Sequence, residues 1–307
     1  MQMNYFAELR HGWRALLAAT IGLGTGFSTT MYVTSAIAPN LIADVGWSKA
    51  SFAAVGTLSI FTALAIPFAG RIADVFGVKR TALIGMIALP LIYFAYSMIS
   101  GDIIEYIVLF CLQGAICVTT TSTVYSRLAV VYFERMRGLA LAVAASGPAV
   151  IGAALSPALN AYVDAEGWRA AFQAVAIFTA ISGVIVYFLI PSEKNAERVH
   201  AEVEEETVKP VRTKRSAKED YPLIFRTPAF WLLLGSMLLV NLPQVVALAQ
   251  LRLVLEDQNI GAGDIGLLFS LFAGGGLVGR AGAGSSGRSR GRLRCAVGDR
   301  SGDSKRH

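Results

Sequence analysis

Long uninterrupted runs of apolar residues recur along most of the chain. Seven of these runs are uncharged: 15–43, 50–70, 81–101, 106–126, 138–163, 170–192 and 227–251. An eighth, shorter run at 265–279 stops at Arg280. Each of the seven is about as long as a helix that crosses a bilayer, which takes roughly 20 residues. A barrel strand would alternate in polarity, whereas 177–190 is apolar on every face. The pattern predicts an all-α integral membrane protein.

The polar segments divide this series of spans into four parts. We expect an N-terminal six-helix bundle at 1–191, a charged cytoplasmic linker at 192–227 and a partial second bundle at 228–280. The linker has no apolar stripe to bury and is typical of a solvated segment. A regulatory or lipid-binding role for its basic half is the alternative.

The last part, residues 281–307, is a tail rich in glycine, serine and arginine, without a further apolar run. We expect it to be disordered or the product of a shifted reading frame, so that the chain is truncated. A native short form with a basic tail is the alternative.

Composition agrees with a membrane protein and excludes other classes. Hydrophobic residues make up 54% and charged residues 16% of the chain, whereas soluble domains carry about 25% charged residues. The net charge of +6 lies mostly in the tail, because residues 1–280 hold 20 basic and 19 acidic groups, so no nucleic-acid partner is expected. The three cysteines lack metal-ligand spacing, and no histidine or carboxylate lies inside a span. We therefore expect no enzyme activity, no cofactor and no metal.

The loops predict the orientation in the membrane. With the N-terminus inside, 16 Lys and Arg residues fall on cytoplasmic segments and three on the opposite side. The excess of basic residues marks the cytoplasmic side, so the N-terminus and the linker are expected there. A cleaved signal peptide ending near 35–38 is the alternative to a first span.

The polar loop after the second span carries a spaced set of residues: Gly70, Asp74, Gly77, Lys79 and Arg80. Glycine permits close approach and a tight turn. Asp74 can pair with the basic residues around it or with a helix N-terminus, and so form a conformational latch. An ordinary polar loop between helices is the alternative.

This spacing resembles the signature loop of the major facilitator superfamily of secondary transporters. The resemblance implies a fold of twelve helices, of which this chain supplies the complete six-helix N-terminal half, helix seven and most of helix eight. It implies alternating access, a multi-pass protein of the bacterial inner (plasma) membrane, and a monomer when full length. Gly147-Pro148 resembles the helix-five bend of antiporter-type members.

A narrower resemblance concerns the oxalate:formate antiporter and monocarboxylate porter branch. It rests on 132–141 and on Arg280, which matches an arginine of helix eight that meets the substrate carboxylate in that branch. A guanidinium suits a carboxylate bidentately. The alternative is that Arg280 only anchors the end of a span.

Polar side chains on three spans are candidates for lining the solute path. They are Thr25, Thr29 and Tyr32 on the first span, Gln113 and Thr120 on the fourth, and Asn241 and Gln244 on the seventh. Hydrogen bonds between helices are the alternative for each. The expected function is transport of a small organic anion such as a monocarboxylate or dicarboxylate, by exchange or facilitated transport. The alternatives are a neutral or drug-like solute, or an inactive truncated fragment.

Overall fold

The computed structural model describes residues 5–133 and 136–191, together with single positions between 227 and 275. The described helices are α1 (Tyr5–Thr25), α2 (Thr29–Val45), α3 (Lys49–Thr57), α4 (Ser59–Phe76), α5 (Val78–Tyr96), α6 (Ile103–Ile116), the 3-10 turn η1 (Cys117–Thr120), α7 (Ser122–Tyr132) and α8 (Arg137–Leu189). This part of the chain is all-helical, as predicted. The linker, most of the expected seventh and eighth helices and the tail lie outside the described residues.

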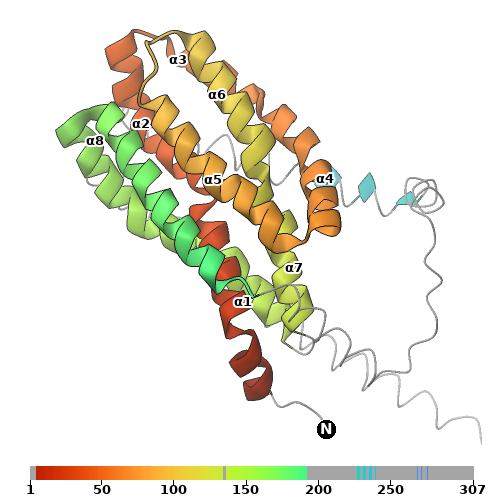
Figure 1. Ribbon diagram of the computed structural model, residues 1–307. Coiled ribbons are helices and arrows are strands. Elements are labelled where there is room, and N and C mark those ends of the chain that lie inside the picture. Colours follow the sequence, from red (N-terminus) through yellow and green to blue (C-terminus); the bar gives the residue numbers. More distant parts are fainter. Residues whose placement is uncertain are drawn as a thin grey trace, which may run out of the picture.

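Five of the described helical stretches are long and apolar enough to cross a membrane. They are Gly12–Val45, Lys49–Phe76, Val78–Tyr96, Ile103–Tyr132 and Arg137–Leu189. The last one contains two arms, because Gly167 leaves the helical conformation with φ 83° and ψ 170°. The chain reverses direction between these two arms (Figure 1). The six spans expected before the linker therefore fall on these stretches, with the fifth and sixth on the two arms of α8.

Three of the spans are interrupted, which the apolar pattern did not predict. The second span divides at Leu58 between α3 and α4. The first span breaks at 26–28, between α1 and α2, and the fourth tightens into η1 and then becomes extended at Thr121. The breaks of the first and fourth spans touch, because the Phe27 backbone N–H donates a hydrogen bond of 2.9 Å to Thr120 Oγ1. Glycine and threonine have low helix propensity, so interrupting the helix at these residues costs little free energy.

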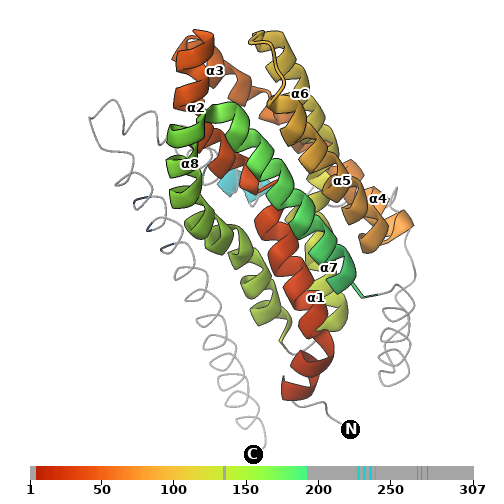
Figure 2. The same ribbon diagram turned by 60° about the vertical axis from the view of Figure 1, so that its left-hand side comes forward.

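Small residues allow the first span to lie directly against its neighbours. A Cβ at Gly147 in α8 would lie 2.1 Å from the Thr20 carbonyl oxygen, and one at Gly24 would lie 2.8 Å from the Gly147 carbonyl oxygen. On another side of α1, the ring of Tyr125 fills the space over Gly22. These contacts pack α1 between α7 and α8 (Figure 2).

The outer surface of the bundle is apolar. Phe68 on α4 is 71% exposed and Phe188 on α8 is 68% exposed, while the buried core contains alanine, leucine and tyrosine. Exposing such an apolar surface to water would cost free energy, whereas contact with lipid tails does not. The exposed surface thus agrees with a bundle surrounded by a bilayer.

Candidate functional site

The signature loop lies at the end of the bundle where α4 meets α5. Gly77 ends α4 and begins α5 with φ 81°, a backbone conformation that favours glycine, and its N–H bonds to the Ala73 carbonyl. Gly70 is buried on α4 and faces α7. A Cβ there would meet Thr123 only at 3.4 Å, an ordinary contact. The close helix approach expected at Gly70 is found instead at Gly24 and Gly147.

Asp74 pairs with an arginine that the loop itself does not supply. Arg127 Nη2 on α7 donates a hydrogen bond of 2.8 Å to Asp74 Oδ1 and a second one of 3.1 Å to the Gly70 carbonyl oxygen. Arg127 Nη1 also donates to the Thr123 carbonyl oxygen. The sequence left open a pairing with the neighbouring basic residues or with a helix N-terminus; in the structure the carboxylate lies toward α7 and pairs with Arg127. The sequence offered one indication of this, an arginine near the inner end of the fourth span.

The basic residues of the loop lie elsewhere. Lys79 Nζ is 4.3 Å from the centroid of the Tyr187 ring, in a cation–π contact with the last turn of α8. Arg80 is exposed on the first turn of α5. The loop therefore joins two neighbours, with Asp74 held by α7 and Lys79 by α8. That these contacts form a latch, which opens during transport, stays a prediction.

The hydroxyls of Thr25 and Thr29 bond to backbone carbonyl oxygens of their own span. Thr25 Oγ1 donates to the Ile21 carbonyl oxygen at 2.9 Å, and Thr29 Oγ1 donates across the break to the Gly24 carbonyl oxygen at 2.9 Å. Their exposed fractions are 6% and 1%. Thr29 thereby satisfies a carbonyl at the open end of α1, where the helix leaves such groups without partners.

Gln113 belongs to a buried network of side chains. Its amide Nε2 donates to Thr30 Oγ1 at 3.1 Å, and its Oε1 accepts from the Tyr96 hydroxyl at 3.4 Å. Thr30 in turn shares a hydrogen bond of 3.1 Å with the Tyr93 hydroxyl. This network connects α2, α5 and α6, and its tyrosines and Thr30 were not among the residues predicted from the sequence. A tyrosine pair at i and i+3 on α5 was the available indication.

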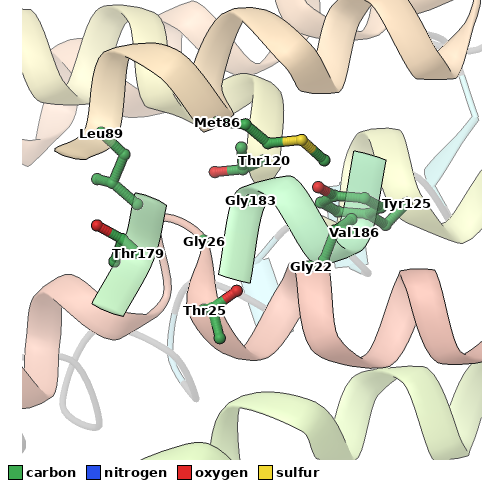
Figure 3. A pocket seen from close by; sticks show the side chains of 10 residues that line it. All are labelled: Gly22, Thr25, Gly26, Met86, Leu89, Thr120, Tyr125, Thr179, Gly183 and Val186. Carbon is green, nitrogen blue, oxygen red and sulfur yellow. The ribbon is translucent and has the colours of Figure 1, made fainter. Parts of the chain in front are cut away.

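Thr120 lies at the contact between the breaks of the first and fourth spans, beside a small cavity (Figure 3). The free volume of the cavity is about 10 Å³, about enough for one water molecule. The residues that line it are Gly22, Thr25, Gly26, Met86, Leu89, Thr120, Tyr125, Thr179, Gly183 and Val186. Of the predicted path residues, the cavity brings together Thr25 and Thr120, but not Thr29, Tyr32 or Gln113. It is too small for an organic solute.

Tyr32 is placed differently from the other candidates. Its side chain is half-buried, and its ring covers Gly152 on the first arm of α8, where a Cβ would lie 2.3 Å from the Tyr32 ring. Tyr32 is therefore partly accessible from outside the six-helix half, unlike the buried Thr25, Thr29, Gln113 and Thr120. The predicted residues Asn241, Gln244 and Arg280 lie outside the described residues.

The predicted bend at Gly147 and Pro148 lies within the first arm of α8. The backbone remains helical at both residues, and Gly167 is the residue of α8 with non-helical dihedral angles. Gly147 contacts the α1 backbone at Thr20 and Gly24. The structure thus shows a packing role for Gly147, while a bend that matters for transport stays a prediction.

The described charged residues are concentrated at the two ends of the bundle. At the end opposite the signature loop, Asp44 Oδ2 accepts hydrogen bonds from Trp168 Nε1 at 2.9 Å and from Arg169 Nη1 at 3.2 Å. This joins the end of α2 to the turn at Gly167. Over the part of the chain that the structure describes, no group of three or more His, Cys, Asp or Glu side chains could hold a metal ion.

The arrangement agrees with a known family of transporters. Residues 16–298 match the family model of the Major Facilitator Superfamily, which is more than nine tenths of the chain. The match continues past residue 281, where the sequence analysis places the end of the family pattern. No curated protein matches the chain. With its apolar helices, its signature loop and this match, the chain belongs to the major facilitator superfamily and is a multi-pass secondary membrane transporter, not a member of an enzyme family.

Proposed function

We propose that the solute is a small organic anion, such as a monocarboxylate or dicarboxylate, and that the protein exchanges it by alternating access. The observation that carries this proposal is the placement of charge. In the described spans the charged side chains lie near the span ends or at the turn of α8, whereas Arg280 follows directly after an apolar run. We place Arg280 within the eighth helix, as in the branch that the sequence resembles, where an ionisable residue inside a span indicates a functional site.

The first half would meet the solute through polar, uncharged groups. Tyr32 is the predicted path residue that is accessible at the surface of the six-helix half, so we assign it the contact from the first span. Asn241 and Gln244 would supply polar contacts from the seventh span, beside Pro243. Secondary transporters bind near the midplane between their two halves, where Arg280 would bind the carboxylate bidentately.

The same placement favours exchange over proton coupling. A proton relay in the membrane needs a titratable carboxylate or histidine within the spans. The chain has none in the interior of its apolar runs. We propose that one anion leaves as another enters. The Asp74–Arg127 pair would act as the latch that holds one of the two conformations of alternating access.

Counterflow in proteoliposomes tests this function. The purified protein is reconstituted into vesicles loaded with unlabelled oxalate, formate or lactate, and uptake of the labelled anion is measured. We expect saturable exchange that Arg280→Ala abolishes and that Arg280→Lys retains in part, since lysine keeps the charge but not the planar fork. The control variant Arg71→Ala removes a charge from the signature loop.

Two outcomes would contradict the proposal. Uptake of a neutral sugar that Arg280→Ala leaves unchanged would remove the anion assignment and leave the family intact. Absence of exchange for all three anions, in protein that elutes as a folded species, would remove the proposed function itself.

A further inference from the structure

Two cations contact the last turn of the second arm of α8, and a third cation follows one of them in the sequence. Arg14 Nη2 on α1 donates a hydrogen bond of 2.9 Å to the Phe188 carbonyl oxygen, and Lys79 Nζ lies 4.3 Å from the Tyr187 ring centroid. Arg80 follows Lys79 and is exposed. Among the described residues, none of these three cations forms an ion pair with a carboxylate. Their remaining N–H donors are available to an external acceptor.

An apolar surface extends from these cations along α5. Arg80 is followed at helical spacing by four exposed side chains, with exposed fractions of 47%, 54%, 63% and 50%; they are Ile84, Ile87, Leu91 and Phe94. Residues at i+4, i+7, i+11 and i+14 lie on one face of a helix. This face therefore begins with a positive charge and continues as hydrocarbon for about four turns.

The second arm of α8 presents an apolar face of its own next to α5. It lies beside α5 in both views (Figures 1 and 2), and a Cβ at Gly183 would lie 3.3 Å from Met86 Cβ. Its exposed apolar side chains, all at least 47% exposed, are Ile177, Ile181, Val184, Ile185 and Phe188. Both helices thus present long apolar faces. Lys79 and Arg80 lie at the start of α5, and Arg14 of α1 contacts the end of α8.

We infer that an anionic phospholipid binds here, with its phosphate on Arg14, Lys79 and Arg80 and its acyl chains along α5 and α8. The combination fits this occupant because an anionic lipid carries a negative headgroup and two hydrocarbon chains in the same order. Basic residues near a membrane surface attract anionic lipids, and basic pockets between helices bind their headgroups. A free phosphate would use the cations but not the apolar faces.

The bound lipid would join three helices at one end of the bundle. Arg14 belongs to α1, and Lys79 and Arg80 belong to α5. Arg14 and Lys79 already contact the last turn of α8. A phosphate shared among them would stabilise this arrangement. The site shares Lys79 and Arg80 with the signature loop, whereas Asp74 and Arg127 are paired with each other, so the lipid does not compete with that pair.

Native mass spectrometry of the purified protein in detergent tests the site. Dioleoyl phosphatidylglycerol is titrated against dioleoyl phosphatidylcholine, which has the same chains and a zwitterionic headgroup. We expect at least tenfold tighter binding of phosphatidylglycerol. Arg80→Gln should weaken it about fivefold, which corresponds to about 1 kcal/mol for one basic residue at a membrane surface. The triple variant with Arg14→Gln, Lys79→Gln and Arg80→Gln should bind both lipids equally.

Arg71→Gln is the matched control. It removes one exposed positive charge from α4 in the same loop region, so it should change phosphatidylglycerol binding less than twofold. An effect of Arg71→Gln as large as that of Arg80→Gln would show diffuse surface charge instead of a site. Equal binding of the two lipids by the unchanged protein, or displacement of phosphatidylglycerol by millimolar inorganic phosphate, would also overturn the inference. Arg80→Gln carries the test because Arg80 makes no hydrogen bond or ion pair with the described residues.

Discussion

Arg127 binds the carboxylate of Asp74 at 2.8 Å and so joins α7 to the end of α4. The same guanidinium donates to the carbonyl oxygens of Gly70 and Thr123. One side chain therefore satisfies the backbone of two helices and the charge of the signature loop together. Because Arg127 comes from a span that is distant in the sequence, the loop depends on the packing of the whole bundle.

The two partners should contribute unequally to stability. Asp74 is 54% exposed and Arg127 is 30% exposed at the side chain, and exposed ion pairs contribute only about 0–1 kcal/mol. We expect Asp74→Asn to lower the free energy of unfolding by less than about 1 kcal/mol. Arg127→Gln should cost more, because it also removes hydrogen bonds to two carbonyl oxygens. Thermal unfolding in detergent measures both, and a larger loss for Asp74→Asn would contradict this account.

The fold was predictable from the sequence to the extent that burial decides it. Runs of apolar residues indicated the spans, and the polar gap between the runs 138–163 and 170–192 indicated the turn of α8. The breaks at 26–28 and at Thr121 were not predictable, because the hydropathy of a run is the same whether its backbone is continuous or interrupted. Hydrogen bonds across the bundle, such as the one from Phe27 to Thr120, decide where the backbone leaves the helix.

The candidate site was less predictable for a related reason. Helical spacing placed Thr25, Thr29 and Tyr32 together on one span, but it does not say which face turns toward a neighbouring helix. In the structure Thr25 and Thr29 are buried, while Tyr32 remains partly accessible. The loop pattern identified Asp74 but not Arg127, since a partner from a distant span leaves no local trace.

The crossing of α1 and α8 should tolerate no side chain at Gly147. A Cβ there would lie 2.1 Å from the Thr20 carbonyl oxygen, so the two helices would have to separate. We expect Gly147→Ala to lower the free energy of unfolding by roughly 1–3 kcal/mol, the usual cost of overpacking a core. Gly138→Ala is the matched control on the same arm, since nothing lies within 4 Å of its Cβ position. Thermal unfolding of both variants checks this, and similar midpoints would argue against the backbone contact.

The turn between the arms of α8 should require glycine at 167. Its φ of 83° with ψ of 170° lies in a region that is essentially restricted to glycine, and other residues there cost about 1–3 kcal/mol. Gly167→Ala should therefore lower the unfolding midpoint. Gly56→Ala, in helical backbone with open space around it, should leave the midpoint unchanged or raise it slightly. A neutral Gly167→Ala would mean that the turn adopts another conformation.

The orientation predicted from the basic loops can be read with single cysteines. In a background without the three native cysteines, Ala165→Cys should react with an impermeant thiol reagent in intact cells, because 165 is exposed at the turn of α8. Val75→Cys, 60% exposed at the other end, should react only after the membrane is opened. Cysteines introduced in 192–227 should behave like Val75→Cys. Reversed labelling of these positions would mean that the N-terminus lies outside.

Gln113 and Tyr32 should separate structural from solute-binding roles among the predicted path residues. Gln113→Ala removes the acceptor of the buried Tyr96 hydroxyl and one of the two hydrogen bonds that join Thr30 to its neighbours, and an unsatisfied buried group costs about 1–3 kcal/mol. We therefore expect it to lower the unfolding midpoint and the amount of active transporter, with KM unchanged.

Tyr32→Phe keeps the ring over Gly152 and should lower stability by no more than about 1 kcal/mol. If Tyr32 contacts the solute, the same change should raise KM for anion exchange. Counterflow kinetics together with unfolding curves distinguish the two residues, and a raised KM for Gln113→Ala with unchanged stability would assign Gln113 to the solute path after all.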